Sequence, residues 1–132
     1  MSGKNRDVPR ISAAEIEILQ ILWQQSPLSA DQIVGRLQQR KDTHPRTAKT
    51  LLNRLLKKEA LGFHEKNRKY HYYPLIDKTE FYREQSDTFL ENFFEGRLTP
   101  LISLFSERSK LSNDDLVELK MLIEKIEADD GE

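Results

Sequence analysis

The residues best suited to chemistry lie between His44 and Lys58, a stretch rich in cations and short polar side chains that contains no carboxylate. Arg, Lys, Asn and Thr are the side chains that hydrogen-bond base edges and phosphates in a DNA groove. An ordinary solvated helix face mixes charges of both signs instead. The composition of this stretch therefore favours a contact with nucleic acid over a plain surface.

Apolar residues in the same stretch recur at helical spacing, which places the polar residues together on one face. The apolar positions i, i+3, i+4, i+7 and i+8 are Ala48, Leu51, Leu52, Leu55 and Leu56. Such a stripe packs on a core and leaves the opposite face exposed. The residues that we expect to contact base edges are Arg46, Lys49, Thr50 and Asn53. Those that we expect to contact phosphates are Thr43, Thr47, Arg54, Lys57, Arg68 and Lys69.

Two further helices precede this one and begin with the same kind of cap. Ser12 followed by Glu15 is a capping box, and it opens an apolar-striped helix that ends before Pro27. Ser29 followed by Gln32 is a second capping box and opens a shorter helix. Three short helices, the last of them basic, predict a helix-turn-helix arrangement.

The hydrophobic period changes after Lys58. Residues 63–65 and 69–73 are rich in aromatics and predict two strands, and Gly62 is expected to follow the helix end as the first strand begins. A turn at 66–68 joins the strands, with Asn67 in the left-handed conformation. The tip of this hairpin carries Lys66, Arg68 and Lys69. The predicted fold class is therefore mainly α with a small β-hairpin wing, that is, a winged helix.

The chain lacks the residue sets that catalysis and metal binding require. It contains no cysteine, which excludes disulfides, thiolate metal sites and cysteine nucleophiles. His64 and His71 could face each other across the hairpin and bind a metal, but no Cys, Asp or further His supplies the remaining ligands at the usual spacing. The sequence also has no Gly-rich phosphate loop and no nucleophile–base pair. We therefore expect neither an enzyme, nor a bound metal, nor a cofactor.

The second half of the chain is predicted to be helical and too apolar to bury its own surface. A helix from Asp77 is interrupted by Gly96 and Pro100, a second apolar segment follows, and Ser112 caps a last helix. Such stripes are hidden either by folding back on the winged domain or, as we favour, by packing on a second copy of the chain. The residues expected at this dimer interface are Phe81, Phe89, Phe93, Leu101, Leu116, Leu119 and Ile123.

Charge divides the chain into the same two parts. Residues 1–75 carry 14 Lys and Arg against 7 Asp and Glu, whereas residues 76–132 carry 7 against 15. A basic first part suits a polyanionic partner, and an acidic second part suits another task. We expect a flexible arm at 1–9, a winged-helix domain at 10–76 and a helical dimerisation domain with an acidic tail at 77–132. No apolar run approaches the ~20 residues that span a bilayer, so we expect no membrane insertion and a soluble, cytoplasmic protein.

In the order and spacing of its motifs, the chain resembles the penicillinase repressor family of winged-helix regulators (BlaI, MecI and the copper-responsive CopY branch). The resemblance extends from Ile11 to Ile126. Its marks in the winged domain are Ser12-x-Ala14-Glu15-x-Glu17, Leu22-Trp23, Pro45-x-Thr47, Thr50-x-x-x-Arg54-Leu55-x-Lys57-Lys58, Ala60-Leu61, Arg68 and Tyr72-x-Pro74. Its marks in the second part are Phe89-Leu90, Phe93, Gly96-x-Leu98 and Leu111-Ser112.

The resemblance implies a homodimeric repressor bound to a palindromic operator of the TACA/TGTA kind. It also implies release from the operator by proteolysis within the dimerisation helices, carried out by a membrane sensor metalloprotease. The family's scissile bond joins Asn to Phe. The matching pair is Leu104–Phe105, which keeps the Phe and replaces the Asn. The copper-responsive branch carries a cysteine cluster, so the lack of cysteine here excludes copper sensing by that route.

Two other functions stay open. One is a winged-helix regulator relieved by direct binding of a ligand in an aromatic-lined dimer cavity. The other is an adaptor whose winged helix contacts protein, against which the acid-free face of residues 44–58 counts. Salt-dependent binding to DNA decides between the adaptor and the regulator.

Overall fold

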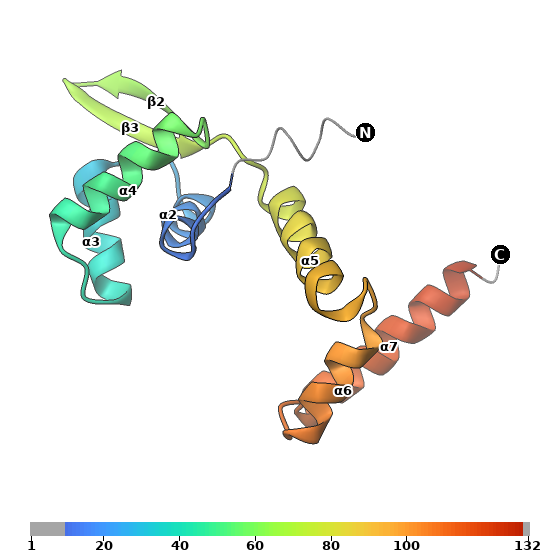
Figure 1. Ribbon diagram of the computed structural model, residues 1–132. Coiled ribbons are helices and arrows are strands. Elements are labelled where there is room, and N and C mark those ends of the chain that lie inside the picture. Colours follow the sequence, from blue (N-terminus) through green and yellow to red (C-terminus); the bar gives the residue numbers. More distant parts are fainter. Residues whose placement is uncertain (1–9, 131–132) are drawn as a thin grey trace. The chain divides into compact units, whose positions relative to one another are not determined.

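The computed structural model describes residues 10–130, which form two compact units (Figure 1). The N-terminal unit ends at Phe81, and the C-terminal unit begins at Tyr82. The predicted fold class is confirmed, because a small antiparallel sheet accompanies an otherwise helical chain. The expected arm at residues 1–9 and the last two residues of the expected acidic tail lie outside the described residues.

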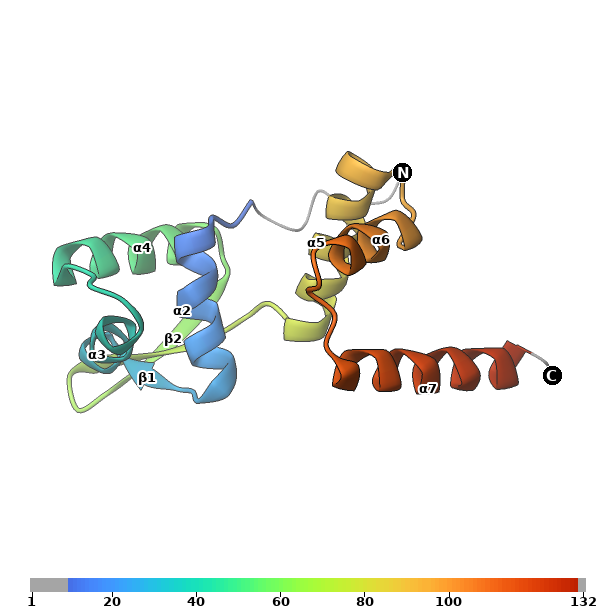
Figure 2. The same cartoon turned by 90° about the horizontal axis from the view of Figure 1, so that it is seen from below.

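Helices α2 (Ala13–Gln24) and α3 (Ala30–Arg40) begin at the caps that the sequence predicts, and α4 (Pro45–Lys57) begins with Pro45 as its first residue. Ser12 Oγ accepts a hydrogen bond from Glu15 N at 3.2 Å, and Ser29 Oγ accepts one from Gln32 N at 3.2 Å. Glu15 and Gln32 in turn accept from the backbone N–H groups of their caps, so both capping boxes are complete. Figures 1 and 2 show the three helices gathered beside the sheet.

The sheet contains three antiparallel strands in the order β1-β3-β2. The predicted hairpin is present as β2 (Leu61–Lys66) and β3 (Lys69–Pro74), and both residues of its turn have positive φ, 56° at Asn67 and 65° at Arg68. The turn is one residue shorter than predicted, because Lys66 pairs with Lys69. Strand β1 (Leu28–Ser29) was not predicted, since two residues are too few to show an alternating pattern.

Apolar side chains from the three helices and the sheet meet in one core. The stripe predicted on α4 is confirmed by the burial of Ala48, Leu51, Leu52 and Leu55. Helices α2 and α3 contribute Ile18, Leu19, Ile21, Leu22, Ile33 and Leu37, and the sheet contributes Leu28, Leu61 and Tyr72. Because one face of α4 is buried in this core, the opposite face must lie on the surface of the unit.

A buried ion pair joins the start of α2 to the end of α4. Glu15 is 1% exposed, and its Oε1 lies 2.6 Å from Lys58 Nζ, which also donates to Arg10 O at 2.7 Å. Burial raises the pKa of Glu15, but hydrogen bonds from Lys58 and Ser12 outweigh it, so the pKa lies below the usual value for a glutamate. Among the described residues, no group donates to Glu15 Oε2.

Helix α4 ends at a left-handed residue, but that residue is not the glycine that the sequence suggests. Glu59 has φ 60°, and its N–H donates to Leu56 O while Ala60 N–H donates to Leu55 O, which is the Schellman pattern. Gly62 instead lies inside β2, where an added Cβ would come within 2.7 Å of the Tyr73 ring. The glycine therefore serves the packing of Tyr73 and not the end of the helix.

The C-terminal unit consists of the rest of α5 (Lys78–Phe94), then α6 (Thr99–Glu107) and α7 (Asn113–Asp130). Gly96 has φ 79° at the predicted interruption, and Pro100 lies in the first turn of α6. No residue of α6 or α7 is buried. Within residues 10–130, no helix is both long enough and apolar enough to span a bilayer.

Phe81 requires a correction, because it was expected in the dimer interface. Its side chain is 2% exposed and belongs to the N-terminal unit, where its ring centroid lies 5.8 Å from that of Trp23. A side chain already buried by its own chain has no surface left for a second copy. The helical period does not distinguish the two cases, since Phe81 lies on the same helix as the exposed Phe89 and Phe93.

We expect Glu15→Gln to lower the free energy of unfolding by about 1–3 kcal/mol at pH 7, because it leaves Lys58 without its carboxylate. A lowered folded-state pKa stabilises the fold above the unfolded-state pKa, and this stabilisation is lost as pH falls through the folded-state pKa. Urea titrations between pH 7 and pH 3 should therefore give a flatter acid slope for the variant. Glu17→Gln, which breaks the more exposed pair with Lys41, should change stability by less than about 1 kcal/mol. Equal losses in the two variants would contradict this role for Glu15.

We expect Glu59→Gly to raise the free energy of unfolding by about 0.5–1 kcal/mol, because glycine adopts the left-handed conformation without Cβ strain. Chemical denaturation of the full chain measures the change. Lys49→Gly, at an exposed position inside the same helix, should lower stability by about 1 kcal/mol and serves as the control. A loss of stability in Glu59→Gly would show that the carboxylate makes a contact that matters more than the strain.

Candidate nucleic-acid interface

The outer face of α4 presents the predicted contact residues of this helix together. All are exposed, and they are Arg46, Thr47, Lys49, Thr50, Asn53, Arg54 and Lys57. Thr43 lies in the loop before the helix and is half-buried, with its Oγ1 3.4 Å from Lys41 O. We refer to the exposed residues of this list as the polar face of α4.

The start of α4 favours an anion. His44 is the N-cap, and its Nδ1 accepts a hydrogen bond from Arg46 N at 3.0 Å. The first turn contains no acidic residue, so the positive end of the helix dipole is not neutralised by a side chain of the helix. Thr50 Oγ1 donates to Arg46 O at 3.0 Å, which leaves the Thr50 hydroxyl as an acceptor and its methyl group free for apolar contact.

Among residues 10–130, no carboxylate forms a salt bridge with the cations of the polar face. Within residues 10–130 the salt bridges are Lys41–Glu17 and Lys58–Glu15, each at 2.6 Å, and neither involves an exposed cation of α4. The acidic residues Glu15 and Glu17 of α2 thus form salt bridges with lysines that lie outside the polar face. Unneutralised cations on one face produce a positive potential that attracts a polyanion.

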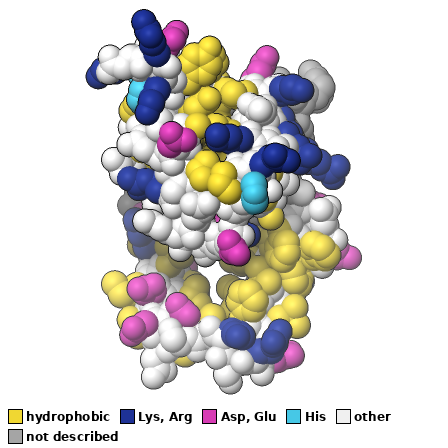
Figure 3. Space-filling view, turned by 90° about the vertical axis from the view of Figure 1, so that its left-hand side faces the viewer, with side chains coloured by type: hydrophobic (Ala, Val, Ile, Leu, Met, Phe, Trp, Pro, Cys, Tyr) yellow, Lys and Arg dark blue, Asp and Glu magenta, His cyan; other side chains and the backbone are white. Residues whose placement is uncertain are grey.

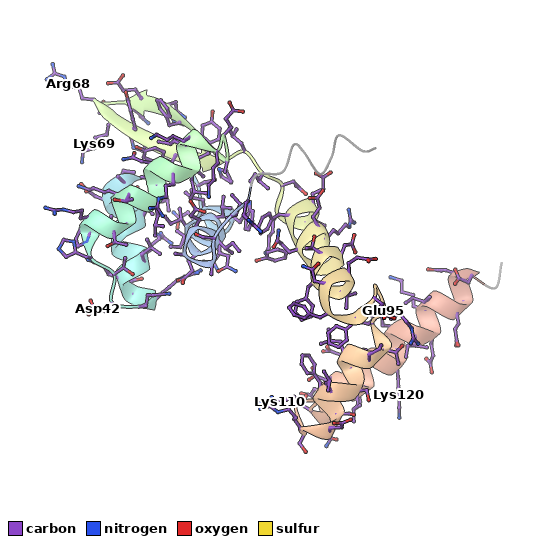
Figure 4. All side chains as sticks on the ribbon, in the orientation of Figure 1. Asp42, Arg68, Lys69, Glu95, Lys110 and Lys120 are labelled. Carbon is purple, nitrogen blue, oxygen red and sulfur yellow. The ribbon has the colours of Figure 1, made fainter. Side chains whose placement is uncertain are left out.

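The hairpin adds cations at its tip. Arg68 and Lys69 are exposed, and Figure 4 shows both side chains at the tip of the hairpin, away from Asp42 in the loop before α4. Figure 3 views the side of the molecule on which the hairpin tip and the start of α4 lie, and Lys and Arg side chains are prominent there. The hairpin therefore extends the cationic surface of α4 with a second element, as a wing does.

Two residues of this surface were not among the predicted contacts. Lys66 is exposed and pairs with Lys69 in the sheet register. The predicted turn included Lys66, whereas the two-residue turn at Asn67 and Arg68 places Lys66 in the strand opposite Lys69. The length of the turn was therefore the information that the prediction lacked. His44 was not predicted as a cap, because histidine is not among the usual N-cap residues.

The two histidines of the hairpin face each other across the sheet. His64 and His71 are directly paired, with ring centroids 6.0 Å apart, and His71 Nδ1 lies 3.2 Å from Lys69 O. Among residues 10–130, no group of three or more His, Cys, Asp or Glu side chains is placed to hold a metal ion.

The residues predicted for dimerisation lie mostly on the surface of the C-terminal unit. Phe89 is 44% exposed and Phe93 is 69% exposed, and their ring centroids are 5.2 Å apart. Leu116 and Ile123 are also exposed, whereas Leu101 and Leu119 are half-buried. A groove of about 560 Å³ separates α6 from α7, and its apolar lining is Ile102, Phe105, Leu111, Leu119 and Leu122.

Comparison with known proteins gives close matches over most of the chain. The model of the penicillinase repressor family matches residues 11–125. The chain is 32% identical over 120 residues to the penicillinase repressor of Bacillus licheniformis, covering 91% of this chain and 94% of that protein. It is also 32% identical over 115 residues to the methicillin resistance regulatory protein MecI of Staphylococcus aureus (strain N315), covering 87% of this chain and 94% of MecI.

Solved structures match the winged helix. The solution structure of the DNA binding domain of the repressor BlaI is similar with a TM-score of 0.51 and 34% identity, over 55% of this chain and 89% of that chain. A second solution structure contains the Bacillus licheniformis BlaI monomeric form in complex with the blaP half-operator. It matches with a TM-score of 0.50, the same identity and the same coverage.

Proposed function

The chain belongs to the penicillinase repressor family of winged-helix DNA-binding regulators, and we propose that it represses transcription as a homodimer on a palindromic operator. The family consists of transcriptional repressors, so the chain is not an enzyme. The observation that carries the proposal is the polar face of α4, which contains no acid and whose cations have no salt bridge among the described residues.

In this proposal, some residues of α4 contact base edges, and other residues of α4 and of the wing contact phosphates. Arg46, Lys49, Thr50 and Asn53 contact base edges in a major groove, since a helix of this width fits that groove and these side chains match its donors and acceptors. Phosphates are contacted by Thr43, Thr47, Arg54, Lys57, Arg68 and Lys69, which fix the register and supply affinity. The operator is of the TACA/TGTA kind that the family resemblance implies.

The exposed apolar surface of the C-terminal unit supports the homodimer. Helix α7 has no buried residue, and Leu116, Leu122, Ile123 and Ile126 are each at least 43% exposed. Large contiguous apolar patches are rare on monomeric proteins. A second copy offers the same apolar helices with two-fold symmetry, and a dimer reads two half-sites of a palindrome. Phe81 is not part of this interface.

Helix α6 supports release by proteolysis at Leu104–Phe105. The helix has no buried residue, and its N-cap, Leu98, makes no side-chain hydrogen bond to it. Leu104 and Phe105 are 47% and 45% exposed. A short helix with little buried surface opens locally at a low free energy, and a protease requires such opening. The sensor metalloprotease implied by the family resemblance is the proposed agent.

Binding of the full-length chain to a TACA/TGTA dyad and to a scrambled duplex, at two salt concentrations, tests the proposal. We expect dyad-dependent binding with two protomers per site. If a dimer neutralises 6–10 phosphates, affinity should fall by about 10³–10⁵ between 50 and 200 mM salt. Equal, salt-sensitive binding to both duplexes would contradict sequence-specific repression. Absence of binding to either duplex would favour the adaptor instead.

We expect Asn53→Ala and Arg68→Gly to weaken binding in different ways. Asn53→Ala should narrow the free-energy gap between operator and scrambled DNA by about 1–3 kcal/mol, because it removes a contact to a base edge. Arg68→Gly should weaken both duplexes equally and reduce the salt slope by about two for a dimer, since each protomer loses one phosphate contact. Glycine is chosen at residue 68 because its φ is 65°. Equal losses on both duplexes for Asn53→Ala would remove Asn53 from the residues that read bases.

We expect Phe89→Asp and Leu119→Asp to produce monomers with weak operator binding, because each places a charge in an apolar interface. Sedimentation equilibrium measures the mass, and the dyad titration measures the binding. Asn92→Asp adds the same charge at an exposed polar position of α5 and should remain dimeric. Intact dimers of the first two variants would refute the assignment of the interface.

A further inference from the structure

From the hydrogen bond between His44 and Arg46 we infer that His44 is a positioning residue for operator recognition, and that protonation of its imidazole lowers the selectivity of the chain for the operator. This inference rests on the proposed reading of bases by α4 and concerns a residue that is not among the proposed DNA contacts. All the residues involved lie in the N-terminal unit.

His44 holds the first turn of α4 through its side chain and its backbone. Pro45 is the first residue of the helix and has no N–H, so the N–H of Arg46 is the first donor of the helix. This N–H donates to His44 Nδ1 at 3.0 Å, and Ala48 N donates to His44 O at 3.1 Å. The imidazole therefore takes the place of the hydroxyl or carboxylate that usually caps a helix.

The residue that His44 holds is itself proposed to read bases. Arg46 N–H is bound by His44 Nδ1, and Arg46 O accepts a hydrogen bond from Thr50 Oγ1 at 3.0 Å. Thr50 is also one of the proposed base contacts. Loss of the cap leaves the N–H of Arg46 without its partner and makes the first turn easier to open. The positions of two proposed base-reading side chains therefore depend on the cap.

The cap requires a neutral imidazole. A neutral ring has one donor and one acceptor nitrogen, and because Nδ1 of His44 accepts, its proton lies on Nε2. Protonation makes both nitrogens donors and removes the acceptor that Arg46 N–H uses. It also places a positive charge at the positive end of the helix dipole. Histidine changes charge between about pH 5 and pH 8, so the cap is present at the upper end of this range and is lost toward the lower end.

The charged groups around His44 offer little compensation for a protonated ring. The hollow of about 250 Å³ beside His44 is lined by Glu17 of α2, by the uncharged Leu37 of α3, and by Lys41 and Asp42 of the loop. Glu17 and Lys41 bind each other at 2.6 Å. Asp42 is exposed, so solvent screens its charge, and the first turn of α4 has no acidic residue. Among residues 10–130, no salt bridge involves His44 or Asp42.

Loss of the cap should affect the reading of bases more than the attraction to phosphates. Hydrogen bonds to base edges require a fixed side-chain position, whereas attraction to the phosphate backbone depends mainly on the number of positive charges. Protonation of His44 loosens the first turn and adds a positive charge. Its expected effect is therefore a smaller ratio of the affinity for operator to the affinity for scrambled DNA, and not weaker binding to both.

The test measures this affinity ratio for the full-length chain at about pH 8 and about pH 5, with the TACA/TGTA dyad and its scrambled duplex. His44→Ser keeps a cap that does not titrate, because serine is a favoured N-cap residue, whereas His44→Ala removes the cap at both pH values. The control combines His64→Gln with His71→Gln, which removes the other two histidines of the chain and keeps the cap. Nitrogen NMR of the His44 ring reports which of its nitrogens carries the proton.

We expect the ratio to fall about fivefold from pH 8 to pH 5 in wild type and in the control, and to stay within about twofold in His44→Ser. His44→Ala should show the lower ratio at both pH values, and Nδ1 of His44 should be unprotonated at pH 8. No fall in wild type, an equal fall in His44→Ser, or a wild-type ratio in His44→Ala at pH 8 would overturn the inference and leave the proposed repressor intact. A wild type that binds both duplexes equally at pH 8 would overturn the proposed function, and this inference with it.

Discussion

The buried pair between Glu15 and Lys58 is the interaction on which the DNA-facing surface depends. The carboxylate is 1% exposed and receives hydrogen bonds from Lys58 Nζ and Ser12 N. One side chain thereby completes the cap of α2 and holds the end of α4. A buried charge without its partner is unfavourable, so this pair stabilises the position of α4 against α2. The polar face of α4 is consequently presented by a rigid scaffold.

The same pairing determines which cations remain available to a partner. Glu15 and Glu17 of α2 bind Lys58 and Lys41, and both lysines lie outside the helical span of α4. Arg40 donates to an uncharged group, Gln20 Oε1. The cations along α4 and at the hairpin tip therefore retain their field. Because the acids of α2 bind lysines outside the polar face, the cations of that face keep their charge and can attract a polyanion.

The two units differ in how much of their apolar surface is buried. The N-terminal unit closes around its own core and includes Phe81, whereas the C-terminal unit leaves Phe93 and Ile123 more than half exposed. One helix, α5, thus begins in the core of the N-terminal unit and continues into the exposed apolar surface of the C-terminal unit. The proposed dimer covers that surface.

Local signals in the sequence determined most of the helices and the contents of the polar face. Capping boxes, Pro45 and the 3.6-residue stripe are read from neighbours within one or two turns, and the structure confirms each of them. The sequence also predicted the hairpin that carries His64 and His71, with a turn one residue longer than the structure has. These features need no knowledge of distant residues.

Only the tertiary structure decided the features that depend on residues far apart in the chain. The pairing of β1 with β3, the binding of Glu15 by Lys58 and the burial of Phe81 against Trp23 each join segments more than 40 residues apart. A helical stripe shows which side chains are apolar and share a face, but it does not show which surface covers them. Phe81 and Phe89 share such a stripe, yet one fills the core of its own chain and the other remains exposed. The difference arises from what packs against each side chain, and periodicity carries no information about that.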